Sequence, residues 1–237
     1  MKLQTDYKPR IVRGSVEIYV PHNGGEIAFA SPAIGPSNYQ NVGKQILKDG
    51  QQVPTGDYTA SLLHATYCDD SVANEPEFKN VRSLMKTNWL WVFNNNLWTS
   101  NGVYVIQDEE ATGRSKPVNI RTLEKRLKSG KEISGVRFSR DGRVIFVPKE
   151  IYLLGDNTPE TFAKDGFIIA SCGQEGAEKL GEVSAKFGNK PYIYGVHVQE
   201  GQMPEQRVSA VLGLVGRLGF GGRWGDDGGS HAFGVRK

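Results

Sequence analysis

Cysteine is scarce in this 237-residue sequence, which contains only Cys68 and Cys172. Two thiols are too few for the disulfide framework that holds small secreted domains together, so we expect a reducing compartment and two free thiols. Long apolar runs are also missing. No segment approaches the ~18 apolar residues that a membrane span needs, and residues 1–8 lack the apolar core of a signal peptide. The sequence therefore predicts a cytoplasmic protein without membrane contact.

Catalytic and cofactor-binding signatures are missing as well. Neither Gly-x-Gly-x-x-Gly nor the Walker arrangement with Lys-Ser/Thr occurs, and the sequence resembles no known family. Disorder is not expected, because 38% hydrophobic and 23% charged residues are ordinary values for a folded protein. The sequence identifies neither a cofactor nor an oligomeric state.

Positive charge is concentrated in one segment. Residues 114–149 contain eleven basic and three acidic residues, whereas the net charge of the whole chain is only +3. A concentrated positive field on a mildly acidic body indicates an anionic partner, and nucleic acid, phosphate ligands and acidic protein surfaces are all eligible. A solvated surface that keeps the protein soluble is the plainer interpretation.

The basic segment also has a periodic arrangement. Apolar residues recur at helical spacing between Asn119 and Ser129, with Asn119 as the N-cap and Gly130 as the stop. Asp141-Gly142 predicts a two-residue hairpin turn within residues 135–147, which would place two arginines opposite each other. The predicted anion-binding residues, on the helix and the hairpin together, are Arg121, Lys125, Lys128, Arg137, Arg140 and Arg143.

Two small constellations suggest chemistry of another kind. Cys172 follows a predicted strand and precedes a predicted helix, where the helix dipole could activate a thiol, with His197 as its base. A packed, inert thiol at a tight turn is the alternative, and we expect Cys172 to be inert. His64 and Cys68 lie four residues apart on a predicted helix and could hold one metal ion from a single face, although no second pair of ligands is evident.

We predict an α+β fold in which helices pack on a mixed sheet. Helices are expected at 38–49, at 57–68 and from Pro76, and strands at 89–93 and 102–108 with Asn94–Asn96 as the turn between them. A C-terminal βαβ unit is expected from a strand at 167–171, a helix at 175–187 and a strand at 192–198. Residues after Pro204 keep helical spacing, and the glycine-rich residues 221–235 predict a closing hairpin. The chain reads as a single domain, residues 1–237, with a possible boundary at 109–117.

The leading functional hypothesis is non-catalytic binding of an anionic macromolecule, nucleic acid first, through the basic helix and hairpin. A hydrolase or transferase that uses Cys172 with His197, or a metal held partly by His64 and Cys68, is the alternative from a different class. A structural or assembly protein that docks its basic face on an acidic partner is the third.

Overall fold

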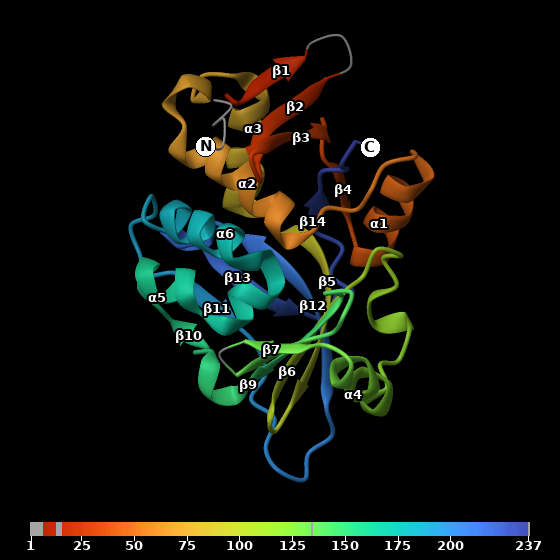
Figure 1. Cartoon of the computed structure of the whole chain (residues 1–237). Coiled ribbons are helices and arrows are strands. Elements are labelled where there is room, and N and C mark those ends of the chain that lie inside the picture. Colours follow the sequence, from red (N-terminus) through yellow and green to blue (C-terminus); the bar gives the residue numbers. More distant parts are fainter. Residues whose placement is uncertain (1–6, 13–15, 134, 237) are drawn as a thin grey trace.

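The structure is a computed structural model that describes residues 7–12, 16–133 and 135–236. Its helices pack on a large mixed sheet, so the predicted α+β fold is confirmed (Figure 1). The helices are α1 (Tyr39–Lys48), α2 (Gly56–Cys68), α3 (Pro76–Thr87), α4 (Ile120–Lys128), α5 (Pro159–Lys164) and α6 (Gly166–Ser184).

The large sheet contains eleven strands among the described residues, in the order β10-β11-β13-β12-β5-β6-β9-β8-β7, with β14 bonded to β5 and β4. A separate three-stranded sheet, β1-β2-β3, packs near α2. The first strands are β1 (Arg10–Val12), β2 (Glu17–His22), β3 (Gly25–Ala30), β4 (Ile34–Ser37), β5 (Leu90–Thr99), β6 (Gly102–Gln107) and β7 (Lys131–Ile133). The others are β8 (Val136–Phe138), β9 (Val144–Pro148), β10 (Gly155–Asp156), β11 (Tyr192–Tyr194), β12 (Glu205–Leu212), β13 (Gly219–Arg223) and β14 (Ser230–Ala232).

Helices cover both faces of the large sheet. Successive side chains of a strand point to opposite faces, and β6 shows the result. Val103 and Val105 belong to the main core together with residues of α6, whereas Tyr104 packs with Leu123 and Leu127 of α4. The sheet therefore separates α6 from α4, and the loop that leads from β6 to α4 runs along one end of it (Figure 1).

Four predicted helices are confirmed, and α1 and α4 among them combine a periodic apolar face with an asparagine cap. Asn38 Oδ1 accepts the Asn41 N–H at 2.9 Å at the start of α1, and Asn119 Oδ1 accepts the Thr122 N–H at 3.3 Å at the start of α4. Each bond satisfies one of the amide groups that a helix leaves unpaired at its first turn. Among the described residues, no helix is long and apolar enough to cross a membrane.

The predicted turn at Asn94–Asn96 is wrong, since these residues continue β5. Their amides are buried and bonded: Asn94 donates to the Ser171 carbonyl at 3.0 Å, and Asn96 donates to Ser209 Oγ at 2.8 Å. Buried amides of this kind need partners in the folded state. A run of three asparagines signals a turn only where such partners are missing.

The predicted C-terminal βαβ unit is wrong in its first strand, whereas its helix lies largely within α6 and its second strand begins at Tyr192 as β11. Residues 167–171 belong to α6, which Asp165 caps by accepting the N–H groups of Phe167 and Ile168. A short apolar run does not distinguish a strand from a buried helix. The helix bends at Gly173, whose φ of 71° marks the junction between two helical pieces. The parallel pair that does occur joins β11 to β13.

The predicted helical spacing after Pro204 and the predicted closing hairpin are also wrong. Residues 205–212 form β12, a strand between β5 and β13 that is buried over most of its length. Its residues 207–212 are all buried, so the helical spacing of its apolar residues does not distinguish this strand from a buried helix. Near the end of the chain, β13 pairs with β11 and β12, whereas β14 pairs with β4 and β5. The glycine-rich segment therefore connects β13 to β14, and these two strands pair with different neighbours instead of with each other.

Close backbone approach brings α2 against α6. A Cβ atom on Gly56 would lie 2.0 Å from the Ser171 carbonyl oxygen, and one on Gly176 would lie 3.2 Å from Asp57 Cα. Residues without a side chain are needed where two backbones come this near. These two glycines set the separation of the helices and thereby place the outer turns of α2 opposite those of α6.

Candidate binding site

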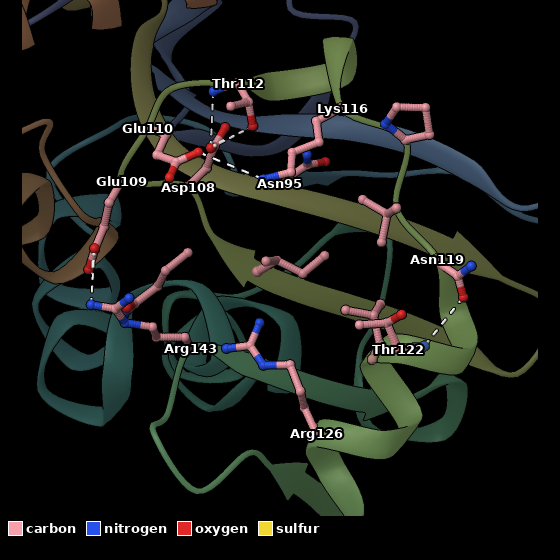
Figure 2. A pocket seen from close by; sticks show the side chains of 15 residues that line it. Asn95, Asp108, Glu109, Glu110, Thr112, Lys116, Asn119, Thr122, Arg126 and Arg143 are labelled. Atoms are coloured by element: carbon pink, nitrogen blue, oxygen red, sulfur yellow. Dashed lines mark hydrogen bonds and ion pairs between the residues drawn. The ribbon is translucent and has the colours of Figure 1, made fainter.

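A pocket of about 420 Å³ opens beside the loop that joins β6 to α4 (Figure 2). Its walls come from β5, β6, the loop and the first two turns of α4. Ile106, Pro117, Val118 and Leu123 give it an apolar wall, and the rest of the lining is polar. The labelled polar residues are Asn95, Asp108, Glu109, Glu110, Thr112, Lys116, Asn119, Thr122, Arg126 and Arg143. We call this cavity the loop pocket.

Asp108 fixes the loop from inside. Its buried carboxylate accepts the Thr112 N–H at 3.0 Å, the Thr112 hydroxyl at 2.9 Å and the Gly113 N–H at 2.7 Å. The Tyr39 hydroxyl of α1 donates to the same carboxylate at 3.1 Å. Burial and the neighbouring carboxylate raise the pKa of Tyr39 well above its usual value, so Tyr39 stays a donor. Hydrogen bonds to a charged acceptor are stronger than those between neutral groups, and four of them converge on this carboxylate.

Three side-chain amides from other elements hold the loop by donating hydrogen bonds to its carbonyl oxygens. Gln40 Nε2 reaches the Thr112 carbonyl at 2.8 Å, and Asn95 Nδ2 reaches the Gly113 carbonyl at 2.8 Å. Gln206 Nε2 donates to the Gly113 carbonyl at 3.1 Å and to the Lys116 carbonyl at 3.2 Å. The amides come from α1, β5 and β12, three elements whose buried side chains pack in one hydrophobic cluster. The loop is therefore built into the fold and presents a preformed pocket.

The charges around the pocket cancel. Three carboxylates and three cationic side chains line it. Glu109 pairs with Arg143 at 3.0 Å and Glu110 with Lys116 at 3.7 Å, as Figure 2 shows. All four side chains are more than half exposed. Exposed ion pairs contribute little stability, so these groups can exchange their partners for those of a ligand.

A second feature lies at the other side of the same loop, where the indole of Trp224 carries two guanidinium groups. Arg207 Cζ lies 3.0 Å and Arg114 Cζ lies 4.4 Å from the ring centroid. Arg114 also pairs with Asp226 at 3.2 Å, which holds it against the ring. Trp224 remains 48% exposed. We call Trp224, Arg114, Arg207 and Asp226 the Trp224 patch.

The predicted anion-binding residues have different roles in the structure. Arg121, Lys125 and Lys128 are exposed on α4, as the helical spacing predicts. Arg137 instead makes a bidentate pair with Glu124, at 2.8 and 2.9 Å, which lowers the pKa of that carboxyl. Arg143 belongs to the loop pocket.

The hairpin at Asp141-Gly142 exists, but its turn is longer than two residues. The last paired residues are Phe138 and Ile145, so Arg140 and Arg143 are not cross-strand partners. Asp141 organises the connection by accepting the Ser139 hydroxyl at 2.6 Å and the Arg143 N–H at 3.1 Å. The connection contains a tight turn at Ser139–Gly142, in which the Gly142 N–H donates to the Ser139 carbonyl at 2.9 Å, inside a longer loop.

Cys172 lies in an environment that suppresses thiolate formation. It is 1% exposed, and burial raises the pKa of its thiol well above the usual value, with the Asp57 carboxylate adding to the shift. Two pockets contain Cys172 in their lining; one of them includes His22, and neither includes His197. His197 is exposed in the segment after β11. This geometry gives a nucleophilic role for Cys172 no support.

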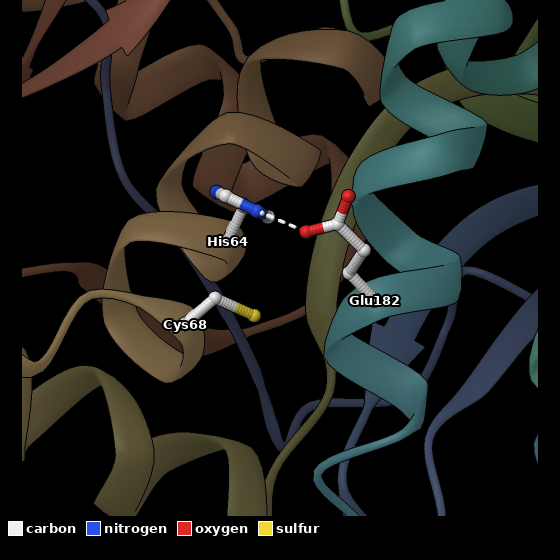
Figure 3. Close-up of side chains that lie close together, drawn as sticks. All are labelled: His64, Cys68 and Glu182. Atoms are coloured by element: carbon white, nitrogen blue, oxygen red, sulfur yellow. Dashed lines mark hydrogen bonds and ion pairs between the residues drawn. The ribbon is translucent and has the colours of Figure 1, made fainter.

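His64 and Cys68 lie side by side on α2, as their spacing predicts, and α6 adds Glu182 opposite them (Figure 3). Sequence reasoning missed Glu182 because helix packing, which no local pattern reveals, brings it there. It also missed Asp108, although an aspartate directly after a strand and before a Thr-Gly pair is a recognisable loop signal.

No protein-family model matches the sequence, and no curated protein matches it. A solved structure described as "Accommodation of massive sequence variation in Nanoarchaeota by the C-type lectin fold" is similar in architecture. The TM-score is 0.51 at 15% sequence identity, and the similarity covers 86% of this chain and 98% of the other. The likeness is one of fold, and that fold is also α+β.

The prediction of nucleic acid binding through the basic segment is wrong. The comparison leads to a C-type lectin fold and provides no evidence of nucleic acid binding. The contacts give a physical reason, since carboxylates from outside the segment pair with three of its cations and reduce the field that the segment alone suggests. These pairs are Arg114–Asp226, Lys116–Glu110 and Arg143–Glu109.

Proposed function

We propose that the chain is a non-catalytic binding protein that recognises a polar segment of a partner protein through the loop pocket and the Trp224 patch. The observation that carries this proposal is the loop 108–119, which separates the two features and is anchored from three elements of the fold. A preformed site avoids the conformational entropy that a flexible loop would lose on binding. Both features therefore suit recognition by a rigid surface.

The charge balance of the loop pocket supports a peptide-like ligand. Glu109 and Glu110 would repel an anionic ligand, although Arg143 would attract it. A cationic ligand would be repelled by Arg143, although the two glutamates would attract it. A polypeptide segment that carries donors, acceptors and side chains of both signs can satisfy every group. Complementary charges at such a site mainly set specificity and association rate.

The composition of the surrounding surface supports a protein partner over a saccharide. Trp and Arg are enriched among the residues that dominate protein–protein binding energy, and Met is enriched in interfaces. Trp224 is half exposed between two arginines, and Met203, which lines a hollow together with Gln206, is 86% exposed. The described lining of the loop pocket contains no aromatic ring on which a sugar could stack. The similar solved structure is described as a fold that accommodates sequence variation, which suits a scaffold for recognition.

Affinity capture with matched baits tests the proposal. The wild-type chain, Trp224→Ala, Arg143→Glu and the control Lys125→Glu are immobilised, and partners are recovered from cells of the source organism. Lys125 is exposed on α4 and outside the lining of the loop pocket, so its reversal changes charge without touching the site. A candidate partner is one that Trp224→Ala or Arg143→Glu loses and Lys125→Glu retains.

The candidate is then purified and its Kd measured by calorimetry. We expect a loss of about tenfold or more for each site variant, which corresponds to about 1.4 kcal/mol. Binding that is equal for all four proteins would contradict the proposal. A glycan array in which a saccharide binds wild type and not Arg143→Glu would replace the protein partner by a carbohydrate ligand.

A further inference from the structure

Three potential metal ligands of different chemistry meet between α2 and α6. His64, Cys68 and Glu182 each offer one ligand atom, and these atoms all lie within 4.8 Å of one another. His64 and Cys68 are one turn apart on α2, and Glu182 reaches across from α6 (Figure 3). Among the described residues, this is the group of His, Cys, Asp and Glu side chains whose geometry suits a metal ion.

The positions of the three ligands are fixed by the two helices. Residues four apart on a helix lie on the same face, so His64 and Cys68 share one rigid support. Gly56 and Gly176 bring the backbones of α2 and α6 into contact, which holds Glu182 at its distance from His64. The chain thereby supplies a site that needs only small side-chain adjustments to close around an ion.

We infer that His64, Cys68 and Glu182 bind one Zn²⁺ ion. Imidazole nitrogen, thiolate sulfur and carboxylate oxygen are the three donor types of zinc sites in proteins. A thiolate and a carboxylate together carry two negative charges, which match the charge of the ion. This mixed set is poorly suited to Ca²⁺ or Mg²⁺, which take oxygen ligands.

Metal binding would replace the hydrogen bond that now links two of the three ligands. His64 Nε2 and Glu182 Oε2 are 2.8 Å apart and share a hydrogen bond. Cys68 would bind zinc as the thiolate, which is the form of cysteine that ligates metals. Binding must release the thiol proton, and affinity therefore rises with pH.

Two lysines lie near the site, one on α6 and one in the turn that follows it. Lys179 is tied to Glu175 at 2.6 Å and to Ser61 at 3.0 Å, which neutralises much of its effect. Lys186 follows α6 and places a positive charge near the Cys68 thiol.

Three protein ligands leave one tetrahedral position open, which is the mark of a zinc site that binds an external group. His64 and Cys68 both line a cavity of about 310 Å³ whose wall also contains His22 and Asp69. Asp69 is already engaged, since its carboxylate accepts the Ser71 N–H and hydroxyl. The fourth ligand would thus be water or a donor group of a small molecule in this cavity.

Calorimetric titration of the chelator-treated full-length protein with Zn²⁺ tests the inference, with native mass spectrometry as the count of bound ions. We expect one ion per chain. Titration with Co²⁺ gives an independent reading, because a thiolate ligand produces an intense sulfur-to-cobalt absorption band. The band should appear in wild type and in Cys172→Ser, and it should be missing in Cys68→Ser.

Glu182→Gln is the decisive variant, because the Glu182 side chain is 66% exposed and its replacement leaves the fold intact. We expect Zn²⁺ affinity to fall by at least about 10-fold, because even the loss of a group that only supports a metal ligand costs about 10–100-fold. Glu178→Gln is its matched control, since Glu178 is an exposed carboxylate one turn away on α6. Equal affinity of Glu182→Gln and Glu178→Gln, binding that survives Cys68→Ser, or no 1:1 binding by wild type would each overturn the inference.

Discussion

At the scale of single residues, Asp141 is the clearest source of pH-dependent stability. The Ser139 hydroxyl, the Arg143 N–H and the Arg126 guanidinium lower the pKa of its carboxyl to about 2, from an ordinary value of 3.8. Because the folded pKa is the lower one, the ionised group stabilises the fold above pH 3.8, and this contribution disappears as pH falls through about 2.

We therefore expect Asp141→Asn to flatten the loss of stability between about pH 4 and pH 2, and to lower stability at neutral pH. Urea unfolding at several pH values measures both effects. Glu132→Gln, on the exposed strand β7, controls for the loss of one negative charge. An acid limb of Asp141→Asn identical to that of wild type would show that Asp141 does not carry this dependence.

The two thiols differ in exposure, and they should differ in reactivity. Cys172 is buried at 1% exposure, whereas Cys68 is partly exposed beside the cavity at α2. Alkylation requires an accessible thiolate. We expect iodoacetamide to modify Cys68 slowly and Cys172 only after unfolding, as peptide mass spectrometry would show. Rapid modification of Cys172 in the native protein would revive its role as a nucleophile.

At the scale of elements, the contact between α2 and α6 depends on the absence of a side chain. Ala at position 56 would place its Cβ 2.0 Å from the Ser171 carbonyl oxygen, so the helices must move apart. We expect Gly56→Ala to destabilise the protein by about 1–3 kcal/mol or more, as overpacking does. Gly188→Ala is the control, because nothing lies within 4 Å of its added Cβ. Denaturant unfolding that gives both variants the same stability would contradict this account.

Local signals predicted some elements and could not predict others. The helices α1 and α4 combine an asparagine cap with a periodic apolar face, and both were predictable. The strand β12 and the first half of α6 are buried on most sides, so their apolar residues show no period that separates strand from helix. Tertiary partners decide the structure of such segments.

The candidate sites divide in the same way. The spacing of His64 and Cys68 predicted one face of a metal site, whereas only Arg143 of the six predicted anion-binding residues lines the loop pocket. Glu182 and Gln206 come from distant parts of the chain and meet these residues only after folding. The sequence alone also does not reveal that the Glu109 carboxylate pairs with Arg143.

At the scale of the whole molecule, the last strands join the large sheet to the N-terminal part. The strand β13 lies between β11 and β12, and β14 bonds to both β5 and β4. Leu218, Phe220 and Phe233 are almost completely buried. Side chains of this kind contribute about 1.5–3 kcal/mol each, and their sum is comparable with the roughly 5–15 kcal/mol that stabilises a folded protein.

Truncation after Gly216 should therefore abolish cooperative unfolding. We expect calorimetry of the truncated protein to show no thermal transition, whereas removal of Arg236 and Lys237 alone should lower the midpoint only slightly. A truncated protein that melts at the midpoint of the full chain would mean that residues 217–237 are an appendage.

Natural selection could exchange the ligand of the loop pocket without redesigning the protein. Inward-pointing groups, Asp108 and Gln206 among them, hold the backbone of the loop. Glu109, Glu110 and Lys116 take part through exposed side chains, which do not support that backbone. Surface substitutions of this kind usually change stability by less than about 0.5 kcal/mol. The loop is thus evolvable: its specificity can be rewritten residue by residue while its shape is inherited.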